Sequence, residues 1–154
     1  MSWTSLAFGK HKGKTLPQVL FSDPDWFFWA KEKEVFKGNL AIEARELYNK
    51  ARRIRIPRKR EEDLVVEYGI HFPTGKFGVM ELVPRERSPH LGSTPTFRSD
   101  YIDMMVPKLQ ANYDKLGYDL FLKNLKFILF GKKSYPMTRE RCEEFFGNEN
   151  NFDL

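Results

Sequence analysis

The sequence predicts an α+β fold, because helical and strand-like patterns of apolar residues occupy separate stretches of its 154 residues. Apolar residues recur with a period near 3.6 over residues 40–54 and again over 119–130, which is typical of amphipathic helices. Between these stretches, over residues 66–83, apolar residues alternate on both sides of a turn sequence, which indicates a β-hairpin. The expected architecture is a small hairpin with helices in the N-terminal part and a β-hairpin with helices in the C-terminal part.

The N-terminal part is expected to begin with a small hairpin or loop over residues 6–16, where two glycines lie among lysines. Asp23-Pro24-Asp25 then has the composition of a helix start, since aspartate can cap a helix and proline suits its first position. The helix that follows runs from Trp26 to about Phe36 and is heavily aromatic. Asn39 is predicted to cap a second helix, which ends before Pro57.

The β-hairpin of the C-terminal part has a register that the apolar pattern predicts. Around the turn 73–76, the expected pairs are Phe72 with Phe77, Ile70 with Val79, Tyr68 with Glu81 and Val66 with Val83. Phe72 and Phe77 are therefore expected to be buried together.

Three helices are expected after the hairpin, beyond a surface loop over residues 84–96. The first runs from Tyr101 to about Tyr113 and is interrupted by a proline. The second covers residues 119–130 and ends at a glycine. The third covers residues 139–146 and is capped by Thr138.

Charge is unevenly distributed along the chain, although the net charge is only +5. Residues 1–60 carry 14 Lys and Arg against 6 Asp and Glu, whereas residues 61–154 carry 12 against 15. Residues 50–60 include seven basic residues and no acidic one, and three acidic residues follow at once. This change predicts two domains, 1–60 and 61–154, of which the first meets a polyanion.

Two basic clusters are the candidate nucleic-acid-binding residues, because phosphate contacts need only exposed cations and backbone N–H groups. One cluster is the loop with Lys10, His11, Lys12 and Lys14, and the other is the run Arg52, Arg53, Arg55, Arg58, Lys59 and Arg60. The loop is also compatible with a solvated hairpin, and the run with docking on the acidic second half or on a partner protein. Trp26 and Trp29 are expected in the core, unless one ring is exposed beside the basic loop as a base-stacking platform.

Several of these motifs resemble the exodeoxyribonuclease X C-terminal-like module. The resemblance rests on the run Phe8-Gly9-Lys10-His11-Lys12-Gly13-Lys14-Thr15, on Asp23-Pro24-Asp25-Trp26 with Trp29, and on Gly38-Asn39-Leu40 with Ala44. It covers residues 6–57, about a third of the chain. That module is found behind exonuclease domains and also alone in small bacterial, plasmid and phage proteins. The resemblance implies an accessory role in nucleic-acid metabolism without an activity of its own.

Residue patterns of common nuclease sites are absent from the sequence. No lysine has an acidic residue two positions before it, and no Asp-x-Glu occurs. Asp100 and Asp103 have a spacing that a shared metal would accept, but helix capping explains them as well. The three histidines have no regular spacing to one another or to the single cysteine, Cys142. We therefore expect no catalytic residue, metal or cofactor.

The sequence thus predicts a non-catalytic nucleic-acid-binding or accessory protein of DNA metabolism, of phage or plasmid type, with DNA preferred over RNA as its partner. Residues 61–154 are expected to contact a protein partner. A protein-interaction regulator whose basic face docks on an acidic partner is the alternative, and a metal-dependent nuclease ranks below it. No apolar stretch is long enough to span a membrane and no signal peptide is present, so a cytoplasmic location without membrane contact is expected.

Overall fold

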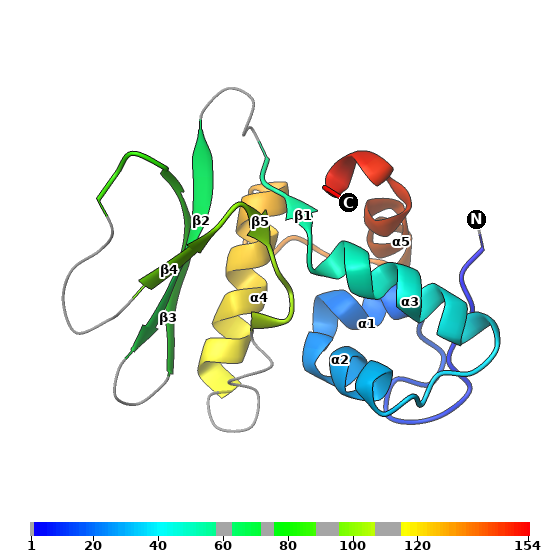
Figure 1. Cartoon of the computed structure of the whole chain (residues 1–154). Coiled ribbons are helices and arrows are strands. Elements are labelled where there is room, and N and C mark those ends of the chain that lie inside the picture. Colours follow the sequence, from blue (N-terminus) through cyan, green and yellow to red (C-terminus); the bar gives the residue numbers. More distant parts are fainter. Residues whose placement is uncertain (1, 58–62, 72–75, 89–95, 107–114) are drawn as a thin grey trace. The chain divides into compact units, whose positions relative to one another are not determined.

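The computed structural model has an α+β fold, as the sequence predicts (Figure 1). It describes residues 2–57, 63–71, 76–88, 96–106 and 115–154. The chain divides into two compact units. The helical unit comprises Met1–Ile54, Asp103–Lys108 and Pro136–Leu154, and the sheet unit comprises Arg55–Ile102 and Leu109–Tyr135.

Four α-helices and a short 3-10 helix build the described part of the helical unit. They are α1 (Leu16–Ser22), α2 (Pro24–Glu32), α3 (Asn39–Ala51), α5 (Arg139–Gly147) and η2 (Glu149–Asn151). The sequence did not predict α1, which begins with a capping box between Thr15 and Gln18. The predicted start of α2 is confirmed, since the carboxylate of Asp23 accepts a hydrogen bond from the Trp26 N–H at 3.4 Å. The N-cap of α3 is Gly38, one residue before the predicted Asn39.

The core of the helical unit is aromatic and joins the two ends of the chain. The ring of Phe21 on α1 lies edge-on to Phe145 of α5, with centroids 5.3 Å apart. Phe146 of α5 stacks on Phe152 at 5.6 Å, and Phe152 forms a β-bridge with Ile54. α5 therefore covers the buried face of α1.

Strands β2 (Leu64–His71), β3 (Lys76–Pro84) and β4 (Thr96–Ser99) form an antiparallel sheet with β2 in the centre. Helix α4 (Lys115–Phe130) contacts β3 along this sheet (Figure 1). The short strands β1 (Ile54–Arg55) and β5 (Tyr101–Ile102) pair with each other.

The β2–β3 hairpin is present, but its predicted register is wrong. Tyr68 lies opposite Met80 and Val66 opposite Leu82, each one residue from the predicted partner. The register shifts between Gly69 and Ile70, which face Val79 and Phe77, so Gly78 is an extra residue on β3. A bulge of this kind breaks the strict alternation on which the prediction depended. Phe72 lies outside the described residues.

Helices of the C-terminal part agree with the sequence in two of three cases. α4 ends at Phe130 and is followed by Gly131, whose φ is +85°. α5 is capped by Thr138, which accepts a hydrogen bond from the Arg141 N–H. The helix predicted from Tyr101 is wrong, because Tyr101 and Ile102 form β5. Its remainder, from residue 107 to 113, lies outside the described residues.

The division into compact units differs from the predicted boundary after residue 60, because residues 103–108 and 136–154 group with the N-terminal segment. This grouping changes the charge balance. The helical unit has 13 basic and 12 acidic residues, and the sheet unit has 13 and 9. The charge asymmetry between the two halves of the sequence is therefore not an asymmetry between units.

Candidate nucleic-acid interface

The predicted small hairpin is a closed loop at the start of the helical unit. The N–H of Leu6 donates to the carbonyl of Lys14 at 2.9 Å, and the N–H of Gly13 donates to the carbonyl of Leu6 at 2.8 Å. Gly9 and Gly13 have φ values of +77° and +88°, which L-residues with a Cβ rarely adopt. We call residues Gly9–Lys14 the lysine loop.

The lysine loop is anchored on the start of α2 by two of its predicted site residues. A ring nitrogen of His11 lies 2.9 Å from the Oδ2 atom of Asp23, and the Nζ atom of Lys10 lies 3.0 Å from the same oxygen. The buried His11 ring also packs edge-on against Trp26, with centroids 5.1 Å apart. Two of the three motifs that resemble the module therefore contact each other, and Lys10 and His11 have a structural partner.

Lys12 and Lys14 have a different environment from their neighbours in the lysine loop. Both side chains are exposed. Within the part of the chain that the structure describes, no carboxylate forms an ion pair with either of them, whereas Asp23 pairs with Lys10 and His11. Their charges are available to a ligand.

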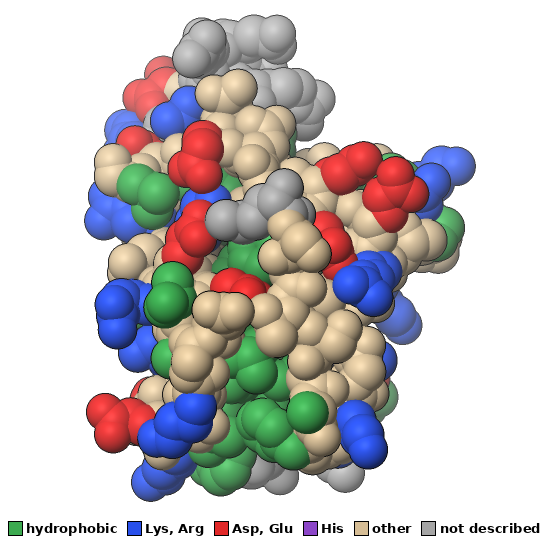
Figure 2. Space-filling view, turned by 90° about the vertical axis from the view of Figure 1, so that its right-hand side faces the viewer, with side chains coloured by type: hydrophobic (Ala, Val, Ile, Leu, Met, Phe, Trp, Pro, Cys, Tyr) green, Lys and Arg blue, Asp and Glu red, His purple; other side chains and the backbone are tan. Residues whose placement is uncertain are grey.

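The connection between α2 and α3 lies against the same tryptophan. The buried ring of Phe36 is 5.8 Å from Trp26, so this connection and the lysine loop each have one ring packed against the same indole. Lys33 and Lys37 are exposed on this connection. Figure 2 shows Lys and Arg side chains around a hydrophobic area in the lower part of the face in view, and most Asp and Glu side chains in its upper part.

Trp29 meets one part of the condition set for a stacking platform, because its ring is exposed. It lies one helical turn after Trp26 and is 46% exposed, unlike the buried Phe27 and Phe28 beside it. Phe8, next to the lysine loop, is 37% exposed. The expectation that both tryptophans lie in the core is therefore wrong for Trp29.

The arginines at the end of α3 are engaged within the protein. The guanidinium of Arg52 lies 3.3 Å from a carboxylate oxygen of Asp103 and 5.7 Å from the ring centroid of Tyr48. Burial alone would lower the pKa of Arg52, but the charge of Asp103 and contact with Tyr48 outweigh it and raise the pKa. Arg53 donates to the carbonyl of Asp153 at 2.6 Å.

The structure does not bring all predicted binding residues together. The lysine loop and the end of α3 lie at different ends of the helical unit (Figure 1). Arg55 is exposed and is the first residue of the sheet unit. Arg58, Lys59 and Arg60 lie outside the described residues.

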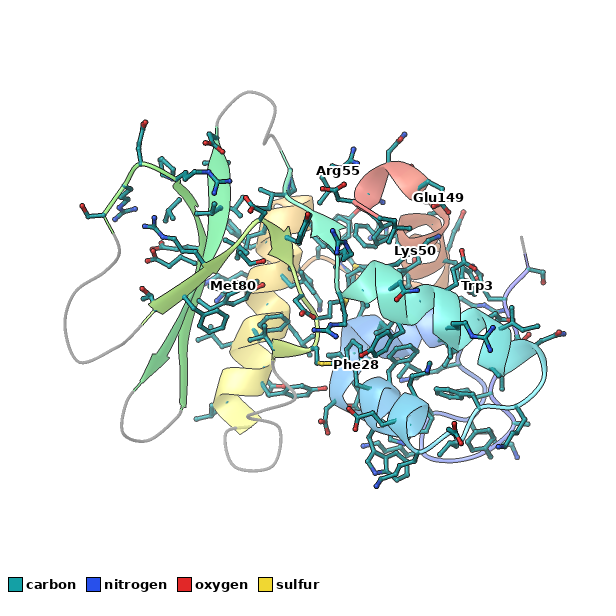
Figure 3. The ribbon with its side chains drawn as sticks, in the orientation of Figure 1. Trp3, Phe28, Lys50, Arg55, Met80 and Glu149 are labelled. Carbon is teal, nitrogen blue, oxygen red and sulfur yellow. The ribbon has the colours of Figure 1, made fainter. Side chains whose placement is uncertain are left out.

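One basic residue of the run 50–60 is buried, which the sequence analysis missed. Lys50 donates to the carbonyl of Phe146 at 2.9 Å and to the carboxylates of Glu149 at 2.7 Å and Glu46 at 2.9 Å (Figure 3). Burial alone would lower the pKa of Lys50, but both carboxylates outweigh it and raise the pKa above the ordinary 10.5. Its place on α3 beside the buried Leu47 and Ala51 was the available signal.

The two carboxylates considered for a shared metal have separate partners. Asp100 forms an ion pair with Arg85, and Asp103 forms one with Arg52. Burial raises the pKa of Asp103 above its ordinary 3.8, while the Met105 N–H and Arg52 oppose part of the rise. Among the described residues, no group of three His, Cys, Asp or Glu side chains is arranged to hold a metal ion. Likewise, no described helix combines the length and apolar character needed to span a bilayer.

Comparison of the chain with protein-family models, with curated proteins and with solved structures finds no match.

Proposed function

We propose that this protein binds single-stranded nucleic acid, as a non-catalytic accessory factor, through a surface that we call the lysine surface. Its members are exposed side chains on the lysine loop, on α2 and on the α2–α3 connection: Lys12, Lys14, Trp29, Lys33 and Lys37. The observation that carries the proposal is the presence of exposed lysines without a carboxylate partner, among the described residues, on a loop that is anchored on α2, the helix that bears an exposed indole.

Phosphate contacts favour these lysines over the arginines at the end of α3. A cation that binds phosphate releases counterions and gains affinity, provided that it does not first lose an internal partner. Lys12 and Lys14 have no carboxylate partner among the described residues that they would lose on binding phosphate. Arg52 would have to leave Asp103 and Tyr48, and the half-buried Asp103 would then lack its cation.

The exposed indole favours single strands. Bases of single-stranded nucleic acid stack on aromatic side chains, whereas the bases of a duplex already stack on one another. Trp29 stands on a helix whose neighbouring ring, Trp26, is fixed between His11 and Phe36. The helix that carries Trp29 is therefore held in place before a ligand arrives, so its backbone does not have to be ordered on binding.

The accessory role and the preference for DNA come from the resemblance of residues 6–57 to the exodeoxyribonuclease X C-terminal-like module. The contact between two of its three motifs, through Asp23 and Trp26, is a structural reason for those two to occur together. The phage or plasmid association and the protein partner of residues 61–154 belong to the same proposal.

Fluorescence anisotropy with a labelled single-stranded DNA of about 16 nucleotides, titrated at several salt concentrations, tests the proposal. The double variant Lys12→Ala/Lys14→Ala should reduce the slope of log affinity against log salt by about 1.4, from about 0.7 per phosphate contact. The matched control is Lys132→Ala/Lys133→Ala, which removes two exposed charges from the sheet unit. This control should leave the slope unchanged.

Trp29→Ala should weaken binding by about 1–3 kcal/mol at every salt concentration, because stacking does not release counterions. If neither single-stranded nor duplex oligonucleotides bind at roughly 50 mM salt, where phosphate contacts are strong, the proposal is wrong. The protein-interaction alternative then takes its place. An equal loss of slope in the control would mean that binding follows net charge and not this surface.

A further inference from the structure

A pocket of about 310 Å³ lies between the end of α2 and the start of α3. Three cationic side chains, Lys31, Lys37 and Arg45, and one carboxylate, Glu34, line it. The buried residues Phe36 and Ala44 contribute an apolar part of the lining. The pocket is thus a concave site whose polar groups are mainly positive.

The charges of this pocket are not neutralised by ion pairs within the described part of the helical unit. Two other basic side chains of this region contact carboxylates, Lys50 with Glu46 and Arg52 with Asp103. Lys31 instead has its Nζ atom 5.4 Å from the ring centroid of Tyr48. Three cations and one carboxylate give the pocket a net charge of +2, which matches a dianion.

The start of α3 adds to the positive potential of the pocket. Its N-cap, Gly38, has no side chain that could cap the first N–H groups, and the first turn contains no acidic residue. The N-terminal end of a 13-residue helix carries a partial positive charge. This end is supporting evidence only, since the three side chains define the site.

We propose that this pocket binds a phosphate monoester, and that its ligand is the terminal phosphate of a nucleic-acid strand. The inference rests on the proposed function and specifies which part of the strand this site takes. A phosphate monoester carries about −1.5 to −2 charges at pH 7, which the pocket complements. An internal phosphodiester carries a single charge and is flanked by sugars on both sides, so it fits an open surface better than a concave pocket.

Glu34 sets the charge of the pocket. It lines the site with one negative charge, so its replacement by a neutral isostere should raise the net charge from +2 to +3. A monoester should then bind more tightly. The expected effect is an increase in affinity. A variant with a disturbed fold would bind more weakly, so an increase distinguishes a charge-selective pocket from a general loss of structure.

The experiment compares 5′-phosphorylated, 3′-phosphorylated and unphosphorylated DNA strands of one sequence on the full chain. At least one phosphorylated strand should bind about tenfold more tightly, as expected for a pair of charge-assisted hydrogen bonds. Lys37→Ala and Arg45→Ala should each reduce this preference, and Glu34→Gln should increase it. Lys12→Ala/Lys14→Ala should weaken all strands alike and leave the preference unchanged.

Titration with inorganic phosphate, followed by amide NMR shifts, distinguishes a site for strand ends from a site for small phosphate-containing molecules. Shifts in wild type that are lost in Arg45→Ala, together with the strand preference, support the proposal. Phosphate binding without any strand preference would overturn the assignment to strand ends and leave a small-molecule site. Equal affinity for all strands and no phosphate shifts would overturn the pocket itself, while the binding by Lys12 and Lys14 would still stand. A phosphopeptide that binds as tightly as the phosphorylated strand would also overturn the nucleic-acid assignment.

Discussion

The ammonium group of Lys50 lies inside the helical unit, where its side chain is 3% exposed. Its three oxygen partners come from α3, α5 and η2, so one charge joins three elements. The Nζ atom also lies 5.4 Å from the ring centroid of Phe152. A buried ammonium is tolerated only when hydrogen bonds replace its lost hydration, and this site provides them. Lys50 is therefore a structural residue, unlike the exposed lysines of the lysine loop.

Lys50→Met should reduce the free energy of unfolding by about 2–3 kcal/mol, because the Phe146 carbonyl loses its donor and two carboxylates lose their cation. Urea denaturation followed by tryptophan fluorescence measures the change. The exposed Lys133→Met is the matched control and should stay within about 0.5 kcal/mol of wild type. Since folding raises the pKa of Lys50 above 10.5, its contribution is present in full below that pH. It is lost as the pH rises through the folded-state value. A loss under 1 kcal/mol at neutral pH would contradict this account.

At the scale of single elements, α2 ends in a Schellman motif with an unusual residue. The N–H of Val35 donates to the carbonyl of Ala30 at 2.9 Å, and the N–H of Glu34 donates to that of Lys31 at 3.2 Å. This motif requires a left-handed residue, which is usually glycine. Here it is Glu34, the only described residue other than glycine with a positive φ, at 55°. The same residue supplies the one carboxylate that lines the pocket between α2 and α3.

Glu34→Gly should stabilise the protein by about 0.5–1 kcal/mol, because a left-handed L-residue costs about 1–2 kcal/mol and glycine loses somewhat more entropy on folding. The control is Glu34→Ala, which removes the same charge but keeps the backbone strain. Thermal unfolding of the three proteins measures the difference. Equal stabilisation by alanine would show that the gain does not come from relief of backbone strain at Glu34.

Elements with local signals were predictable, and elements that depend on distant partners were not. The caps Asp23 and Thr138 define the starts of α2 and α5 within a few residues of sequence. β4 pairs with β2, about thirty residues earlier, and nothing in its own four residues indicates that partner. The bulge at Gly78 shifts the hairpin register in a way that apolar alternation does not encode. The same holds for the site, where cations were identifiable but their carboxylate partners were not.

At the scale of the whole chain, the last nineteen residues explain why the helical unit is less basic than residues 1–60 alone. Residues 136–154 contain five acidic side chains and belong to the helical unit. Glu149 contacts Lys50, and Glu143 accepts a hydrogen bond from Thr15 at 3.0 Å. A contact between positions more than ninety residues apart has no local signature. The basic N-terminal sequence is thus partly matched by its own C-terminus.

Deletion of Pro136–Leu154 should abolish the cooperative unfolding of the helical unit. Without α5, the buried face of α1 with Leu20 and Phe21 becomes exposed, and Lys50 loses its partners on α5 and η2. The stabilisation lost with these contacts exceeds the free energy of unfolding of a unit of this size, since a small domain is only marginally stable.

Tryptophan fluorescence during urea denaturation reports this unit selectively, because Trp3, Trp26 and Trp29 all belong to it. The truncated chain, and residues 1–60 alone, should each show a gradual change instead of a sigmoidal transition. Addition of a peptide with the sequence of residues 136–154 should restore the transition, because the aromatic contacts and the partners of Lys50 return with it. A sigmoidal transition of residues 1–60 at the same urea concentration as the full chain would show that they form a domain without α5.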